Sequence, residues 1–416
     1  RGSEAEPETF KRACNAAGLS GALSDELNAS PAPPPIDTDG MVVSAAGVIE
    51  PVNLDTTKDT IAEAVAVFDF TVADGGGADE TGMRLTAITL PITGGDDTSR
   101  AKLTWLVQRA NGAMFPMTHN AAADRLELRE IDFEIAHGSS ETFTLRAYYH
   151  DNTGLTEGTR FGLSLTGAID FTVTGTQISS RSPVTNGSGS VVTVEASMLV
   201  FTQQPEGEVA GVPLTNQPIV QARDAFGNVD RDFTEIITLT ETGRGKLGGV
   251  TAVAAVAGTA VFTEVSHKPA VDGELLVIVA DDEADLTVGT RTDLPSVSAN
   301  SLRSDVIATK LVFIEEPAPL TVINTQLTAL TTAPRVVAVN ADGIIDRDYE
   351  AVVSLTGSAG AAALRVAGSE ETTEVEVPIA SGEATFSALS ITYTNATAAS
   401  ETFTLNASSG ELSTGV

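Results

Sequence analysis

The sequence predicts an all-β protein in which tandem β-sandwich domains follow a short helical N-terminal segment. Apolar and polar residues alternate in stretches such as "VFDFTV" and "LELREIDFEI", which is typical of strands that bury one face. Turns rich in Gly and Asp separate the short apolar runs, and one long segment of the chain is repeated. Ala, Thr, Val and Gly dominate, and β-branched side chains suit a pleated sheet.

The N-terminal segment differs in composition from the rest of the chain. Residues 4–27 have helical composition, and Phe10, Cys14 and Ala17 are spaced to share one face. The prolines of "NASPAPPPIDTDG" then predict an extended connector. We therefore expect residues 1–40 to form a helical segment followed by a linker.

Residues 41–194 are expected to form the first β-sandwich. Apolar runs such as "RLTAITLPI", "KLTWLVQ" and "TFTLRAYY" alternate with turn signals, and seven or more strands of this kind are typical of a sandwich.

An internal repeat fills the rest of the chain. The run that starts at Glu195, "EASMLVFTQQPEGEVAG", matches "IATKLVFIEEPAPLTVI" from Ile307, so the period is 307 − 195 = 112 residues. Each copy contains about seven predicted strands, and a period this long fits an immunoglobulin-like sandwich better than a solenoid. The predicted domains are residues 195–306, the first copy, and residues 307–416, the second copy.

The two copies differ at their ends. The second copy stops at "ELSTGV" and has no counterpart to "SVSANSLRSDVIA". Either the polypeptide was cut at this point, or the last sandwich lacks a strand that another chain provides. An open sheet edge is a template for an added strand, so the second alternative would allow head-to-tail assembly.

Composition excludes several classes of function. The formal net charge is −32 with only 24 Lys and Arg residues, so nucleic acid would be repelled along most of the chain. The single cysteine, Cys14, excludes an intrachain disulfide, and no run of about 18 apolar residues predicts a membrane span. The acidic surface is compatible with a salty environment, with divalent cations, or with protection of exposed sheet edges.

The run "LVFTQQPEGEVAGVPLTNQPIVQARDAFGNVDRDFTEIITLT" resembles the immunoglobulin-like repeats of very large bacterial surface and adhesin-type proteins. The shared features are an "LVF-x-x-Q-P" strand, an "A-x-D-x-x-G-N" turn and an "F-x-x-x-I-T-L-T" strand. The resemblance extends over residues 45–416 and implies a bacterial, extracellular or cell-surface protein. The second copy departs from the pattern, because Asn340 replaces Asp224 and Ile344 replaces Asn228.

An acidic turn in the first copy is a candidate Ca²⁺ site. Several oxygen donors within one turn are what a hard cation needs, although the EF-hand pattern is absent. The alternative is a structural turn, because Asp and Asn side chains bond to nearby backbone and Gly227 allows a positive φ. The candidate ligands are Asp224, Asn228, Asp230 and Asp232.

A second candidate cation site is the glycine-rich loop "DFTVADGGGADE" of the first domain, for which a solvated hairpin tip is the alternative. Its candidate ligands are Asp74, Asp79 and Glu80.

No catalytic motif is present, and we expect no enzymatic activity. His150 and Asp151 adjoin, but neighbours in a strand point to opposite faces. The leading hypothesis is a structural subunit or stalk of an extracellular assembly, such as a filament, sheath or surface layer, that self-associates through strand or N-terminal contacts. The alternative is an adhesin segment whose first domain binds a glycan or protein ligand.

Overall fold

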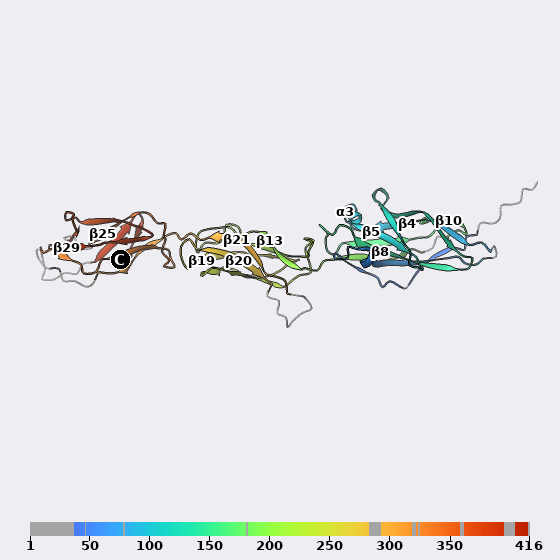
Figure 1. The fold of residues 1–416 in the computed structure, drawn as a ribbon, viewed down its shortest axis with the longest axis horizontal. Helices are drawn as coiled ribbons and strands as arrows, with labels where there is room; N and C mark the ends of the chain where they lie inside the picture. The colour runs from blue at the N-terminus through green and yellow to red at the C-terminus, as the bar shows by residue number, and fades with distance from the viewer. Residues whose placement is uncertain are drawn as a thin grey trace, which may run out of the picture. The chain divides into compact units, whose positions relative to one another are not determined.

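The computed structural model describes residues 37–45, 47–77, 80–179, 182–282, 293–317, 322, 325–357, 362–394 and 404–414. Within these ranges the chain is almost entirely β, as the alternating pattern predicts (Figure 1). The predicted N-terminal helix lies outside the described residues. No helix in the described ranges has the length and hydropathy that a membrane span requires.

The chain divides into two compact units. The first consists of residues 1–152 and 158–192, and the second of residues 153–157 and 193–416. Both copies of the repeat therefore belong to the second unit.

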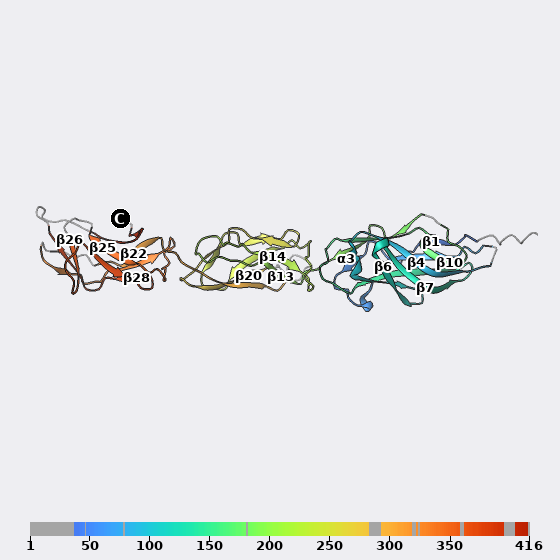
Figure 2. The same ribbon diagram turned by 90° about the horizontal axis from the view of Figure 1, so that it is seen from above.

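The first unit contains one continuous antiparallel sheet of 12 strands. Its main path runs β1-β3-β8-β5-β6-β7-β4-β9-β12-β2, while β10 pairs with β4 and β11 with β9. Figure 2 labels β1, β4, β6, β7 and β10 of this sheet. Hydrogen bonding thus joins the strands predicted for the first sandwich into a single sheet. The strands are β1 (Met41–Ser44), β2 (Asn53–Asp55), β3 (Val65–Ala73), β4 (Met83–Thr93), β5 (Leu103–Gln108), β6 (Met114–Asn120), β7 (Arg125–Ile135), β8 (Ser140–Tyr149), β9 (Arg160–Leu165), β10 (Phe171–Gly175), β11 (Val184–Thr185) and β12 (Ser190–Thr193).

Three short helical turns interrupt this sheet: η1 (Ile61–Glu63), α3 (Asp97–Ala101) and η2 (Ala121–Ala123). The α3 turn begins after Asp96, whose side chain accepts a hydrogen bond from the Ser99 amide as an N-cap.

Aromatic rings from distant strands meet in the core of the first unit. The Phe143 ring of β8 stacks between Phe70 of β3 and Phe133 of β7, with centroid distances of 5.5 and 6.0 Å. Phe171 of β10 meets Phe70 edge to face at 6.1 Å. Strands from both halves of the sheet therefore share one core, so the sheet folds over on itself.

In the first copy, two main sheets enclose a common apolar core. One has the order β13-β14-β18 and the other β17-β15-β20-β21. Phe233 and Phe262 are buried between them together with Ile237 and Leu276. The strands are β13 (Met198–Gln203), β14 (Ile219–Arg223), β15 (Ile236–Glu241), β16 (Lys246–Gly248), β17 (Ala252–Ala254), β18 (Thr259–Val261), β19 (Ser266–Lys268), β20 (Leu275–Asp281) and β21 (Val297–Arg303).

The second copy repeats this arrangement with a core of its own. The sheet β22-β24-β28 corresponds to β13-β14-β18, and β27-β25-β30-β31 corresponds to β17-β15-β20-β21. Phe386 is fully buried, as Phe262 is in the first copy. The strands are β22 (Lys310–Glu315), β23 (Thr328–Ala329), β24 (Arg335–Val339), β25 (Val352–Gly357), β26 (Ala362–Val366), β27 (Glu374–Pro378), β28 (Glu383–Thr385), β29 (Leu389–Tyr393), β30 (Leu405–Ser409) and β31 (Leu412–Ser413).

The two copies end in strands of different length. In the first copy β21 pairs with β20 from Leu275 to Ala280. In the second, the short strand β31 takes the corresponding place and pairs with Ser408 and Ser409 of β30. The residues "ELSTGV" thus include the short strand β31.

Candidate metal centre

The acidic turn of the first copy lies between β14 and β15, and Asp224 stabilises it internally. Asp224 is 1% exposed, and its Oδ1 accepts hydrogen bonds from the backbone amides of Phe226 (2.9 Å) and Asn228 (2.8 Å). The turn closes at Gly227, whose φ of 86° suits glycine. This is the role of an aspartate that caps a turn.

The second copy builds the same turn with different side chains. Asn340 Oδ1 accepts from the Ile344 amide at 3.0 Å, and Gly343 has a φ of 83°. Because asparagine can replace aspartate in this role, the turn does not depend on a carboxylate charge. The geometry at Asp224 favours the structural alternative for this residue.

Asn228 also makes structural hydrogen bonds. Its Nδ2 donates to Asp224 Oδ2 at 2.8 Å, and its Oδ1 accepts from the Leu155 amide at 2.7 Å. Of the four predicted ligands, Asp230 and Asp232 are the two that join a carboxylate cluster, and Glu157 is its third member.

Glu157, Asp230 and Asp232, here called the first cluster, each place a carboxylate oxygen within 4.8 Å of the other two. Asp230 is fully buried, and its Oδ2 accepts from the Ala196 amide at 2.9 Å. Glu157 accepts hydrogen bonds from the backbone amides of Arg231, Asp232 and Val194. Burial, followed by the charges of Asp232 and Asp230, raises the pKa of Glu157.

Asp272, Asp346 and Asp348, here called the second cluster, reproduce this arrangement in the second copy. Asp272 Oδ1 accepts from the Val306 amide at 2.8 Å and Oδ2 from the Arg347 amide at 2.9 Å. Asp346 Oδ2 accepts from the Ala308 amide at 2.8 Å. Each amide lies 112 or 116 residues after its counterpart in the first cluster, so the repeat reproduces the hydrogen bonds as well as the strands.

Two carboxyl groups in and beside the second cluster have raised pKa values. Burial, and then the neighbouring Asp348, raises the pKa of Asp346. Burial, and then the charges of Asp348 and Asp272, also raises the pKa of Asp305. Burial and neighbouring negative charge thus disfavour the charged forms of Asp346 and Asp305.

Glu157 and Asp272 lie more than 70 residues before the Asp-Arg-Asp motifs, so the ligand pattern of a single turn does not reveal them. Each is followed by glycine and by a strand, and each precedes the Asp-Arg-Asp motif by a similar distance, 230 − 157 = 73 and 346 − 272 = 74 residues. An acidic residue that precedes glycine at a nearly constant distance from the Asp-Arg-Asp motif is the sequence signal that could identify them.

A third group of carboxylates lies at the end of β20. Asp281, Asp282 and Asp293 bring one oxygen each within 4.8 Å of the others. Asp282 is buried, and burial, followed by the charges of Asp293 and Asp281, raises its pKa.

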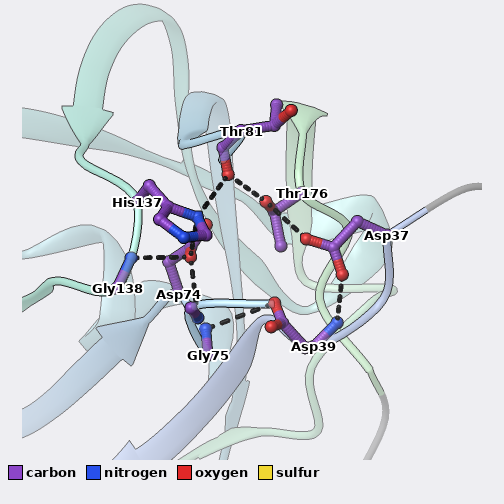
Figure 3. Close-up of polar contacts among 9 residues, drawn as sticks. Asp37, Asp39, Asp74, Gly75, Thr81, His137, Gly138 and Thr176 are labelled. Atoms are coloured by element: carbon purple, nitrogen blue, oxygen red, sulfur yellow. Dashed lines mark hydrogen bonds and ion pairs between the residues drawn. The ribbon is translucent and has the colours of Figure 1, made fainter. Parts of the chain in front are cut away.

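In the glycine-rich loop of the first unit, Asp74 joins the loop to neighbouring segments (Figure 3). Its Oδ1 accepts from the amides of Gly138 (2.9 Å) and Gly76 (3.1 Å) and lies 3.5 Å from His137 Nδ1. Burial acts to raise the pKa of Asp74, but hydrogen bonds led by the one from the Gly138 amide outweigh it and lower the pKa.

Two further aspartates lie beside this loop (Figure 3). Asp37 Oδ2 accepts from Thr176 Oγ1 at 3.0 Å, and Asp39 Oδ1 accepts from the Gly75 amide at 3.2 Å. Of the other predicted ligands, Asp79 lies outside the described residues. Glu80 is exposed, with a φ of 56°. The hydrogen bonds at Asp74 favour a loop anchored by its carboxylate.

His150 and Asp151 engage different partners. His150 Nδ1 lies 3.2 Å from Thr104 Oγ1, and Asp151 forms an ion pair with Lys102 at 3.2 Å.

Comparison with the known protein families and with curated proteins found no match for this chain.

Proposed function

We propose that this chain is a segment of an extracellular structural protein, in which tandem immunoglobulin-like β-sandwiches form a stalk or a subunit of a surface assembly. The observation that carries the proposal is the duplicated set of hydrogen bonds around residues 230–232 and 346–348, here called the corners. In both copies, a preceding acidic residue and the first residues of the copy bond to the corner.

The sheets of the second unit support the immunoglobulin-like part of the proposal. Each copy has a three-stranded and a four-stranded antiparallel sheet around one core, within a length of about 110 residues that is usual for this fold. Sandwiches repeated in one chain make a spacer, because each copy folds around its own core while the connections stay the same.

The duplicated corner also supports a mechanical role over a binding role. Each connection is held by hydrogen bonds between three backbone amides and two buried or half-buried carboxylates. These bonds restrict the conformations of the connecting chain more than a free linker would. The acidic surface, with a formal net charge of −32, opposes unspecific adhesion between sheet edges.

Electron microscopy and light scattering of the full chain test the proposal. Ordered polymers support a self-assembling subunit, and elongated monomers without a ligand support a stalk. Deletion of residues 1–30 then asks whether the N-terminal segment makes the subunit contacts. A monomer with saturable binding to one glycan on an array, abolished by changes in the first unit, would contradict the proposal in favour of an adhesin segment.

A further inference from the structure

The second cluster combines three segments of the second unit at one point. Asp272 lies between β19 and β20, while Asp346 and Asp348 lie between β24 and β25. Their carboxylate oxygens are within 4.8 Å of one another. The backbone that leads into β22 joins them, because Val306 and Ala308 donate their amides to Asp272 and Asp346.

One oxygen in this cluster lacks a protein donor. Asp346 is 5% exposed, and its Oδ1 has no hydrogen-bond partner among the described residues. A buried carboxylate oxygen without a donor destabilises a fold by an amount comparable to a lost charged hydrogen bond. The neighbouring groups of the cluster are two other carboxylates, which repel Asp346 when they are charged. A bound cation would coordinate the oxygen that has no donor and would also offset the repulsion between the carboxylates.

We propose that Asp272, Asp346 and Asp348 bind a Ca²⁺ ion. The donors are oxygens only, which favours a hard cation over zinc or another metal that prefers nitrogen and sulfur. Ca²⁺ accepts oxygen ligands in a flexible geometry, whereas Mg²⁺ demands a near-ideal octahedron, so carboxylates supplied by separate loops suit Ca²⁺ better. Asp348 is exposed, so water can complete the coordination from its side.

The first cluster is the internal counterpart of this site. Its Val194, Arg231 and Ala196 amides match those of Val306, Arg347 and Ala308, and Glu157 takes the place of Asp272 with a side chain longer by one methylene. The same chemistry extends to it, with Asp230 and Asp232 in the places of Asp346 and Asp348. The proposal concerns the ion alone, and it holds whether the chain is a stalk, a filament subunit or an adhesin segment.

Calorimetric titration of the chelator-treated full chain with CaCl₂ tests the site directly. We expect saturable binding by the wild-type chain and the loss of one class of sites in Asp348→Asn. This variant removes an exposed charge and leaves the Asp346 and Asp272 hydrogen bonds intact, so it is expected to fold. The matched control is Asp342→Asn, an exposed carboxylate of the same turn that pairs with Lys268 at 3.2 Å outside the cluster.

Thermal unfolding in CaCl₂ and in EDTA provides the second measurement. At a free ion concentration of about 100 times Kd, binding to the folded state alone raises the ratio of folded to unfolded chains about 100-fold. In Asp348→Asn, calcium should no longer stabilise the second copy against thermal unfolding. In Asp342→Asn, this stabilisation should remain. MgCl₂ at the same ionic strength should give a smaller gain.

Three results would overturn the proposal. They are an absence of calcium binding by the wild-type chain, equal binding by Asp348→Asn, and an equal loss in Asp342→Asn, which would indicate a diffuse response of the acidic surface. None of them bears on whether the chain assembles, so microscopy remains an independent test of the proposed function.

Discussion

Replacement of Asp224 by alanine separates the two interpretations of the acidic turn. The side chain is 1% exposed and accepts at least three hydrogen bonds, from the amides of Phe226 and Asn228 and from Asn228 Nδ2. At about 1 kcal/mol for each bond, the variant should destabilise the first copy by about 3 kcal/mol. The loss should be the same in calcium and in EDTA, because the residue acts through the turn.

Two matched variants calibrate this value. Asn340→Ala in the second copy removes one side-chain bond, to the Ile344 amide, and should cost about 1 kcal/mol. Asp224→Asn keeps the oxygen that accepts from both backbone amides but loses the acceptor for Asn228 Nδ2. Its free energy of unfolding should therefore lie between those of wild type and Asp224→Ala.

Urea unfolding followed by circular dichroism, together with hydrogen exchange of residues 219–241, measures the effect. The chain has one tryptophan, Trp105, which is buried in β5 of the first unit, so its fluorescence reports the first unit and should not change. If Asp224→Ala unfolds like wild type in EDTA but no longer responds to calcium, the structural role of Asp224 is refuted.

Three further predictions concern the cores, a glycine and pH. Phe262→Ala and its counterpart Phe386→Ala remove fully buried rings and should each cost about 3–5 kcal/mol by urea unfolding; a loss below about 1 kcal/mol would contradict the assigned core. Gly258→Ala would place a Cβ 2.1 Å from the backbone oxygen of Asp230 in the corner. It should lower the free energy of unfolding far more than Gly343→Ala, because Gly343 has a similar φ but a Cβ there would meet no atom within 4 Å. Equal losses of stability in the two variants would contradict the close approach at Gly258. Burial and a neighbouring carboxylate raise the pKa of Glu50 from 4.5 to about 7, so the stability it contributes is present below the unfolded pKa and is lost as pH rises toward neutrality. Glu50→Gln should therefore melt higher than wild type at about pH 8 and no higher at about pH 4, and the reverse order would refute the assignment.

The all-β fold was predictable because side-chain alternation and turn residues are local signals. The stretch "RLELREIDFEI" is one strand, β7, as its alternation predicts. The continuous sheet of the first unit was not predictable, because alternation indicates which face a strand buries but not which strand it pairs with. The ring contacts of Phe143 with Phe70 and Phe133 depend on those pairings.

The candidate site was predictable in part for a related reason. Asp230 and Asp232 belong to a motif that recurs in the sequence, and both enter a carboxylate cluster. Asp224 and Asn228 look equally suitable as ligands, but in a short turn their side chains reach backbone amides first. Glu157 and Asp272 come from segments more than 70 residues away, and only the fold brings them to the corner.

The acidic residues that precede the two corners are equivalent, so the chain can change its length by whole repeats. Glu157 and Asp272 serve equivalent corners, 73 and 74 residues downstream, through equivalent amides. Excision of one whole period would therefore bring Glu157 to Asp346 and Asp348 and recreate the same group of three carboxylates. A gene built in this way can gain or lose copies by recombination without a new connection having to evolve, provided that the exchange spans a complete period.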